Sequence, residues 1–317
     1  MKVRTNWQSK PESTFGLGID FVLWCHTHLG KHFSHTIIWF IALTVWLLNP
    51  SVRKVSKQYL DNLKQFAAVN NISLPHLSTL KHINRFCNNF LDQLLSWQNK
   101  LDMRDVIPVD NSHERFVIQT TKNTGSIIIS AHIGNIEMMR AINNHLQIKN
   151  KLNIIIWMNN NKRFMKYLKK LDPNSNINLI PSNNIDPSTI FTLDDKIKKG
   201  EVIVILADRI TGSESKTVEV EFLGKKAFLP QGPWILAGIL NAPVFTSYNI
   251  YSDGRYHSYL NEWGPIKLRD RKNREEEIKQ LASRFIQELE EMVIKSPYDW
   301  FNFYNFWQEP VNSQKQK

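Results

Sequence analysis

His132 and Glu137 are residues whose types and spacing allow acid–base chemistry. An imidazole with a carboxylate in reach is a general base with an orienting partner, because the carboxylate fixes the tautomer and stabilises the imidazolium that forms. The same pair also fits a structural role, in which Glu137 satisfies the histidine and complements the start of a helix. The spacing alone does not choose between these interpretations.

The residues around this pair predict a strand, a turn and a helix. Ile127 to Ile129 are consecutive β-branched residues, which favours a strand buried on both faces, as in a parallel sheet. Gly134 allows a sharp turn, and Asn135 is the predicted N-cap of the helix that follows. We therefore expect His132 at the carboxyl end of a strand and Glu137 in the first helical turn, where open α/β sheets bind ligands.

Further strands and helices are expected along the chain. Buried strands are predicted at 152–158, 177–180 and 202–206, and helices at 186–200, near Pro233 and at 274–295, with a hairpin between Tyr248 and Leu260. Alternating strands and helices indicate an α/β fold with a largely parallel sheet flanked by helices. Asp208 and Arg209 follow the strand at 202–206, so we expect them at the same rim of the sheet as His132.

Three other segments carry less information about chemistry. Residues 56–104 show apolar positions at helical intervals, with Pro75 as the break between two helices. Residues 222–232 are predicted to form a loop before the helix near Pro233. The aromatic-rich segment 298–307 is expected to pack in the core, with a membrane or acyl-chain contact as the alternative.

Residues 1–57 are expected to form a membrane-associated helical segment, and residues 58–317 an α/β domain. The uncharged run from Thr36 to Leu48 has 13 residues, whereas a helix that spans a bilayer needs about 20. A re-entrant or interfacial helix is therefore favoured over a full crossing, with a core helix as the alternative. Residues 1–57 contain seven Lys or Arg residues against two acidic ones, which favours an anionic membrane surface.

The composition is basic and contains few cysteines. Forty Lys and Arg against 29 Asp and Glu give a formal net charge of +11. This charge suits nucleic acid, anionic lipid or an acidic carrier protein, although a soluble basic protein without such a partner has the same composition. Cys25 and Cys87 match no metal-ligand spacing and indicate a reducing compartment. Nucleophile-elbow, Walker, zinc-protease and dinucleotide motifs are absent from the sequence, so serine hydrolase, kinase, zinc protease and dehydrogenase functions have no support.

Five blocks of sequence, taken together, resemble one superfamily. They are Ser130-Ala-His-Ile-Gly-Asn-Ile-Glu-Met-Met-Arg140, Ala207-Asp-Arg209, Phe222-Leu-Gly224 with Phe228-Leu-Pro230, Ala242-Pro-Val244 and Trp300-Phe-Asn-Phe-Tyr-Asn-Phe-Trp307. In this order they resemble the lysophospholipid acyltransferase superfamily, and within it the bacterial lipid A late acyltransferases and the related acyltransferases of aryl polyene and flexirubin-type pigment clusters. The resemblance implies a glycerol-3-phosphate acyltransferase-like fold.

The resemblance also implies a reaction. An acyl group would pass from an acyl carrier protein or coenzyme A thioester to a hydroxyl of a lipid or glycolipid acceptor, without an acyl-enzyme, a metal or a cofactor. His132 would be the general base, and Glu137 would hold the imidazole. Asn135, Asp208 and Arg209 are the expected substrate-binding residues, and Arg209 would bind a phosphate or carboxylate or stabilise the oxyanion. A structural ion pair is the alternative for Asp208 and Arg209.

The expected partners are acyl carrier protein, anionic lipids and the lipid acceptor, and the expected location is the cytoplasmic face of the inner membrane. Two other functions remain open. One is a thioesterase on the same fold, in which water replaces the acceptor. The other is a non-catalytic basic protein that binds membrane or nucleic acid, although no helix-turn-helix, aromatic RNA platform or zinc module is recognisable.

Overall fold

The protein is described from a computed structural model that covers residues 15–101, 103–109, 112–121, 124–139, 142, 150–156, 171–172, 176–181, 185–211, 215–268 and 273–309. Its helices are α1 (Phe15–Leu29), α2 (Lys31–Leu48), α3 (Pro50–Val69), α4 (Thr79–Trp97), η2 (Met103–Asp105), α5 (Ser112–Thr121), α8 (Pro187–Lys198), α9 (Gly232–Leu240) and α10 (Arg274–Lys295). Its strands are β1 (Val106–Pro108), β2 (Ser126–Ser130), β3 (Leu152–Ile156), β4 (Ile177–Pro181), β5 (Val202–Leu206), β6 (Thr217–Phe222), β7 (Lys225–Pro230), β8 (Pro243–Ser252) and β9 (Arg255–Pro265).

A seven-stranded sheet with the order β1-β9-β8-β2-β5-β3-β4 forms the centre of the molecule. All neighbouring strands in it are parallel except β8 and β9, which form an antiparallel hairpin. Asp253 and Gly254 at the tip of this hairpin both have positive φ, as a type I′ turn requires. The predicted α/β class with a largely parallel sheet is confirmed.

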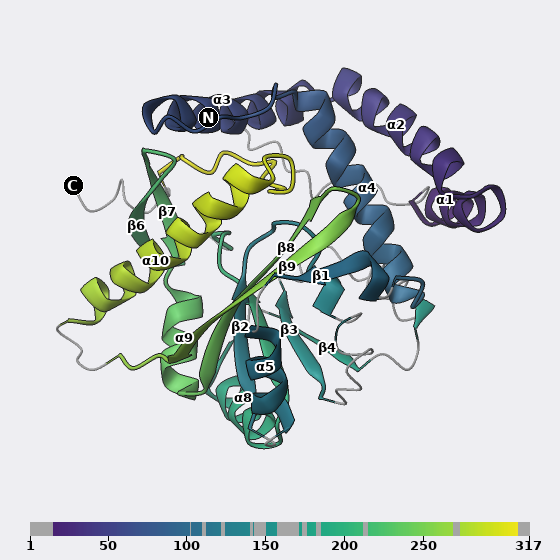
Figure 1. The fold of residues 1–317 in the computed structure, drawn as a ribbon. Coiled ribbons are helices and arrows are strands. Elements are labelled where there is room, and N and C mark those ends of the chain that lie inside the picture. The colour runs from purple at the N-terminus through teal and green to yellow at the C-terminus, as the bar shows by residue number, and fades with distance from the viewer. Residues whose placement is uncertain are drawn as a thin grey trace.

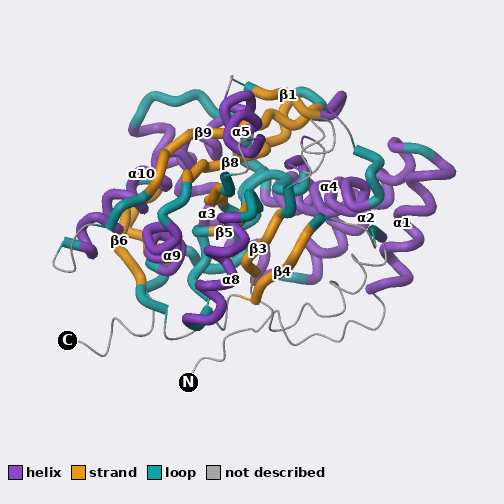
Figure 2. Tube along the Cα trace, turned by 90° about the horizontal axis from the view of Figure 1, so that it is seen from below, coloured by secondary structure: helices purple, strands orange, loops and turns teal. Residues whose placement is uncertain are grey.

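The three isoleucines of β2 show why this strand is buried on both faces. Ile127 and Ile129 belong to one hydrophobic cluster, and Ile128 belongs to another on the opposite face of the sheet, because successive side chains of a strand point to opposite faces. The first cluster includes residues of α3, α8, α9 and α10. The second includes residues of α1, α2, α4 and α5. Figures 1 and 2 show these helices around the sheet.

Local sequence signals account for several helix boundaries. Pro50 and Pro187 occupy the first turns of α3 and α8, where the missing N–H costs nothing. Asp186 caps α8, because its Oδ1 accepts a hydrogen bond from the Thr189 backbone N–H at 2.8 Å. α10 begins with three glutamates and ends with Lys295, which complements the helix dipole.

One predicted loop is a strand. Residues 225–230 form β7, which pairs with β6 in a separate antiparallel sheet, so the prediction of a loop at 222–232 was wrong for these residues. The alternation in β6, where Val218, Val220 and Phe222 are buried between exposed glutamates, was the overlooked signal.

The first four helices lie along one side of the molecule (Figure 1). α3 runs across residue 57, the predicted domain boundary, without a break, and the Tyr59 hydroxyl on α3 donates to the Pro297 carbonyl at 2.8 Å. The division into domains at this residue stays a prediction. Among the described helices, α2, with 18 residues, is long and apolar enough to cross a membrane.

Candidate active site

His132 lies in a loop, residues 131–135, that follows β2 and is fixed by backbone hydrogen bonds. The His132 carbonyl accepts from the Phe301 N–H at 2.8 Å, and the Gly134 N–H donates to the Asp299 carbonyl at 2.8 Å. The Asn135 N–H donates to the carbonyl of Asn249 on β8 at 2.9 Å. The loop is therefore held between β8 and the segment that follows α10.

Gly134 makes this close packing possible. Its φ is +60°, and a Cβ atom at this position would lie 1.7 Å from the Asn249 carbonyl oxygen. An L-residue is disfavoured by the backbone conformation and excluded by the contact. The predicted sharp turn at Gly134 is confirmed.

The carboxylate that contacts the His132 imidazole belongs to Asp208. Nδ1 of His132 lies 2.7 Å from Asp208 Oδ1, and the His132 backbone N–H donates to Oδ2 at 3.0 Å. This contact follows from the sheet, because Ser130 of β2 is paired with Leu206 of β5, so that the residues two positions beyond them are neighbours. The structure thus brings together the two rim residues that the sequence placed at the ends of separate strands.

Asp208 is also held by the C-terminal aromatic segment. The Trp300 Nε1–H donates to Asp208 Oδ2 at 3.2 Å, and the Tyr304 hydroxyl donates to the Asp208 backbone carbonyl at 2.7 Å. The Trp300 ring is fully buried against Tyr59, Phe222 and other rings. The predicted core packing of these aromatics is confirmed, and it also fixes the carboxylate beside His132.

The charges of this pair follow from burial and from Arg209. Burial lowers the pKa of His132 and Arg209 lowers it further, and together they outweigh the raising effect of Asp208. For Asp208, burial alone would raise the pKa, but the charge and hydrogen bonds of His132 and the charge of Arg209 bring it to about 2. Near neutral pH, Asp208 is ionised and the imidazole is neutral. A proton on Nδ1, directed at Asp208, leaves Nε2 as the free base.

Arg209 is fixed beside His132 by the same C-terminal segment. Its Nη2 donates to the Phe301 carbonyl at 2.8 Å, and its guanidinium lies 5.5 Å from the centre of the Tyr304 ring. Nε is buried and has no hydrogen-bond partner within the described part of the chain. A fixed guanidinium beside the imidazole is a suitable group for an anion.

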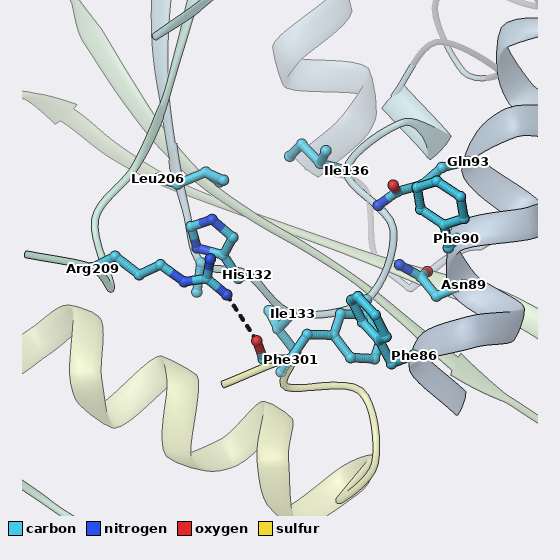
Figure 3. Close-up of a pocket in the computed structure, with 12 residues that line it drawn as sticks. Phe86, Asn89, Phe90, Gln93, His132, Ile133, Ile136, Leu206, Arg209 and Phe301 are labelled. Carbon is cyan, nitrogen blue, oxygen red and sulfur yellow. Dashed lines mark hydrogen bonds between the residues drawn. The ribbon is translucent and has the colours of Figure 1, made fainter. Parts of the chain in front are cut away.

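A cavity of about 210 Å³ lies in front of His132 and Arg209 (Figure 3). Phe86, Asn89, Phe90 and Gln93 of α4 form its opposite wall. His132 has 29% of its side chain exposed, whereas Asp208 has 1%, so the imidazole is the accessible member of the pair. The volume is below the ~300–1,000 Å³ typical of ligand pockets, which leaves space for reacting groups and not for two whole lipid-sized substrates.

Two predicted site residues have other contacts in the structure. The sequence interpretation made Glu137 the partner of the imidazole, whereas the carboxylate on Nδ1 is that of Asp208. The Glu137 N–H donates to Asn135 Oδ1 at 3.0 Å, and its carbonyl accepts from Ser96 on α4. Asn135 is fully buried, and its Oδ1 has the capping role expected at a helix start. Participation of Glu137 in the reaction and of Asn135 in substrate binding stay predictions, and the predicted helix after Asn135 falls largely outside the described residues.

The sequence interpretation missed the residues that surround the pair. Trp300, Phe301 and Tyr304 position Asp208, His132 and Arg209, and α4 supplies the wall of the cavity. The dense aromatic composition of the C-terminal segment was visible, but its place beside β2 and β5 was not. Within the described residues, no three His, Cys, Asp or Glu side chains are grouped so that they could hold a metal ion.

Comparison with known proteins supports a lipid-modifying enzyme. Residues 103–309 match the family described as bacterial lipid A biosynthesis acyltransferase, and no curated protein was found to match the chain. The matched range includes the loop of His132, Asp208, Arg209 and the aromatic segment. The match confirms the resemblance noted in the sequence. The chain belongs to the bacterial lipid A biosynthesis acyltransferase family, whose members acylate lipids and associate with membranes.

Proposed function

We propose that this lipid acyltransferase moves a fatty acyl group from a thioester to a hydroxyl of a lipid or glycolipid acceptor, with His132 as the general base. The observation that carries the proposal is the contact between His132 Nδ1 and the buried Asp208 carboxylate. This contact supports one tautomer and leaves Nε2 directed to substrate.

The reaction needs a base because a hydroxyl is a poor nucleophile near neutral pH. Nε2 takes the hydroxyl proton while the oxygen attacks the thioester carbonyl and a tetrahedral intermediate forms. The C–S bond then breaks, and the imidazolium returns the proton to the thiolate that leaves. Asp208, ionised at neutral pH, stabilises the imidazolium between these two steps.

We assign to Arg209 the binding of a negatively charged group. Arg209 lines the cavity beside His132. A guanidinium there supports two roles, the binding of a substrate phosphate or carboxylate and the stabilisation of the oxyanion. Together with burial, its charge lowers the pKa of His132, which favours a neutral imidazole that can act as a base.

The donor that we propose is an acyl carrier protein or coenzyme A thioester. A thioester is already activated, so the reaction needs no metal or resident cofactor. The net charge of +11 suits both an acidic carrier protein and an anionic membrane. We place the reaction at the cytoplasmic face of the inner membrane, where thioester donors and membrane lipids meet.

The test is an assay of the purified chain with acyl carrier protein and coenzyme A thioesters of several lengths. A bacterial lipid extract serves as acceptor, and mass spectrometry identifies the product. His132→Ala and Asp208→Asn should each lose about 10²- to 10⁴-fold in turnover. Asp194→Asn, on the partly exposed surface of α8, is the matched control. Full turnover by His132→Ala would falsify the assigned base.

A parallel Glu137→Gln variant separates the two carboxylates. A loss confined to Asp208→Asn supports Asp208 as the partner of the imidazole. A loss confined to Glu137→Gln would return that role to Glu137. Fatty acid released without acceptor, and no acylated lipid in its presence, would instead indicate a thioesterase.

A further inference from the structure

α4 presents two carboxamides to the cavity, opposite His132. Four residues of α4 that line the cavity lie three and four positions apart and share one face of the helix: Phe86, Asn89, Phe90 and Gln93. Figure 3 shows that the amide ends of Asn89 and Gln93 point toward the cavity. The wall opposite the imidazole therefore carries two neutral polar groups beside two phenyl rings.

The protein leaves these two amides incompletely paired. Asn89 is only 2% exposed, and the Tyr256 hydroxyl lies 3.2 Å from its Oδ1. The amino group of Asn89 and the whole amide of Gln93 have no hydrogen-bond partner within the described part of the chain. Because a polar group that is buried without a partner is costly, we expect a ligand group in the cavity to bind these amides.

Charged residues behind this wall hold Asn89 in place. The Tyr256 hydroxyl also lies 2.5 Å from Asp92 Oδ2 and accepts a hydrogen bond from Arg85 Nη2 at 3.0 Å. The Arg85 and Asp92 side chains are largely buried, and neither is among the described residues that line the cavity. The Asn89 carboxamide is therefore oriented before a ligand arrives, which lowers the entropic cost of binding.

Both walls of the cavity are fixed to Asp299. Its Oδ1 accepts a hydrogen bond from Arg85 Nε at 2.5 Å, and its backbone carbonyl accepts the one from Gly134 in the His132 loop. The fold thus sets the separation between the α4 amides and the imidazole. A ligand group that binds the amides has a defined position relative to the base.

The two walls suit groups of different charge. Arg209 is the permanent cation among the described residues that line the cavity, and it suits an anion. Asn89 and Gln93 carry no charge, and a carboxamide offers both N–H donors and a carbonyl acceptor. The group that matches this pair is neutral and carries an acceptor and a donor, as a secondary amide does.

The proposed thioester donor has such an amide close to its reacting carbon. Acyl carrier protein and coenzyme A share the pantetheine arm, in which two carbons separate the sulfur from an amide nitrogen. A cavity of about 210 Å³ that receives the thioester beside His132 therefore also receives this amide. The more distant parts of either donor lie outside it.

We propose that Asn89 and Gln93 bind the pantetheine amide next to the thioester and thereby select donors that carry it. The side-chain amino groups donate to the carbonyl of this amide, and the Gln93 carbonyl accepts from its N–H. The inference rests on the thioester donor of the proposed function, and it names the part of that donor that the protein recognises. It applies to both kinds of donor, because both carry the arm.

Two small donors that differ at one atom test the inference. An acyl thioester of N-acetylcysteamine carries the amide, whereas the thioester of O-acetyl-2-mercaptoethanol has an ester oxygen in place of the N–H. Both are assayed with the bacterial lipid extract as acceptor. The unmodified chain should use the amide donor about 10- to 100-fold better in kcat/KM, because the ester leaves a carboxamide unpaired.

Asn89→Leu combined with Gln93→Met removes both amides at nearly unchanged size. The double variant should use the amide donor no better than the ester donor, and its kcat/KM for the ester donor should stay unchanged. Asn88→Leu is the matched control on α4, because the Asn88 amide donates to the Asn84 carbonyl and Asn88 is not among the described lining residues. This variant should keep the preference.

Three results of this assay would overturn the inference. Acyl transfer by the unmodified chain without a preference between the donors would do so and would leave the proposed function intact. An equal loss with both donors in the double variant would assign a structural role to the amides. A change confined to the KM of the acceptor would assign them to the acceptor.

A binding measurement covers the case in which the chain transfers no acyl group and the proposed function fails. The thioether S-decyl-N-acetylcysteamine, which cannot transfer its chain, is titrated calorimetrically into the unmodified chain beside its O-acetyl counterpart. Binding of the N-acetyl compound that is about tenfold tighter, and is lost in Asn89→Leu with Gln93→Met, would support the amide site by itself. Equal affinity for the two compounds would overturn it.

Discussion

The loop of His132 and the outer surface of α1 and α2 differ in whether they bury polar groups or expose apolar ones. Around His132, polar groups are buried, and the loop and the imidazole are hydrogen-bonded to β8, Asp208 and the C-terminal segment. On α1 and α2, apolar rings are exposed, and the threonines are paired within their own helices. The first region holds its polar groups through specific partners in the chain, whereas the second leaves large apolar side chains exposed.

The comparison shows what each region requires from the sequence. In the loop, each hydrogen bond joins a specific donor and acceptor at a fixed distance, so a single substitution should cause a large loss of stability or activity. On the helices, the many exposed apolar side chains make no directional contacts, so a single substitution there should change the stability of the fold little. Three predictions, in order of expected effect, test this contrast.

The largest difference is expected when a glycine is replaced by alanine in the His132 loop and, separately, in α1. Gly134→Ala should unfold or misplace the loop and remove acyl transfer, because its Cβ would collide with the Asn249 carbonyl. Gly18→Ala in α1 meets no atom within 4 Å and should raise the free energy of unfolding by up to about 1 kcal/mol, since alanine favours a helix. Turnover and urea unfolding of the two variants check this. Equal effects would contradict the contrast.

A smaller loss of stability is expected at acid pH, because His82 is buried. His82 is held between Ser56 and the Trp300 carbonyl, and burial lowers its pKa to about 4. Its unfolded pKa is higher, at 6.5, so the unfolded state binds the proton first. Stability is therefore complete above pH 6.5 and is lost as the pH falls toward 4, by about 2 kcal/mol between pH 6.5 and 5.

Urea unfolding at several pH values measures this loss. His82→Gln should be less stable than the unmodified chain at pH 7 but should lose less stability between pH 6.5 and 5. His35→Gln on α2, where burial also lowers the pKa of a partly buried histidine, should retain most of the pH dependence. An unchanged slope in His82→Gln would show that other groups cause the acid sensitivity.

The smallest effect concerns the pH profile of the reaction. Because burial and Arg209 lower the pKa of His132, the acid limb of kcat/KM should lie below pH 6.5. Arg209→Gln should move this limb to higher pH, since the imidazole then holds its proton more tightly. Lys57→Gln, at an exposed position of α3, is the control without a shift. A limb that moves to lower pH would exclude a direct action of Arg209 on the imidazole.

The fold was largely predictable because its strands and helices carry strong local signals. Three consecutive isoleucines predicted β2, and the apolar stripe between Arg274 and Lys295 predicted α10 with its boundaries. β7 was missed because Gly224, the two lysines that follow it and Pro230 favoured a loop. Its strand conformation depends on pairing with β6.

The site was only partly predictable. The positions of His132, Asp208 and Arg209 at the rim followed from the strands before them, but their pairing did not. Proximity in sequence indicated Glu137 as the partner of His132. In the structure, β2 and β5 are neighbours in the sheet, and this places Asp208 beside the imidazole. Local sequence patterns do not predict the order of parallel strands. The contribution of Trp300 and Tyr304 depends on contacts across more than 90 residues.

The docking of residues 299–304 against the His132 loop also sets an order of events during synthesis. A ribosome makes β2 and β5 long before Asp299, Trp300 and Phe301, which supply the last hydrogen bonds to the loop and to Asp208. Until these residues leave the ribosome and dock, the backbone of the loop and the Asp208 carboxylate lack these hydrogen bonds. The hydrogen bonds that fix Asp208 and the His132 loop can thus form only after nearly all of the described chain has been made.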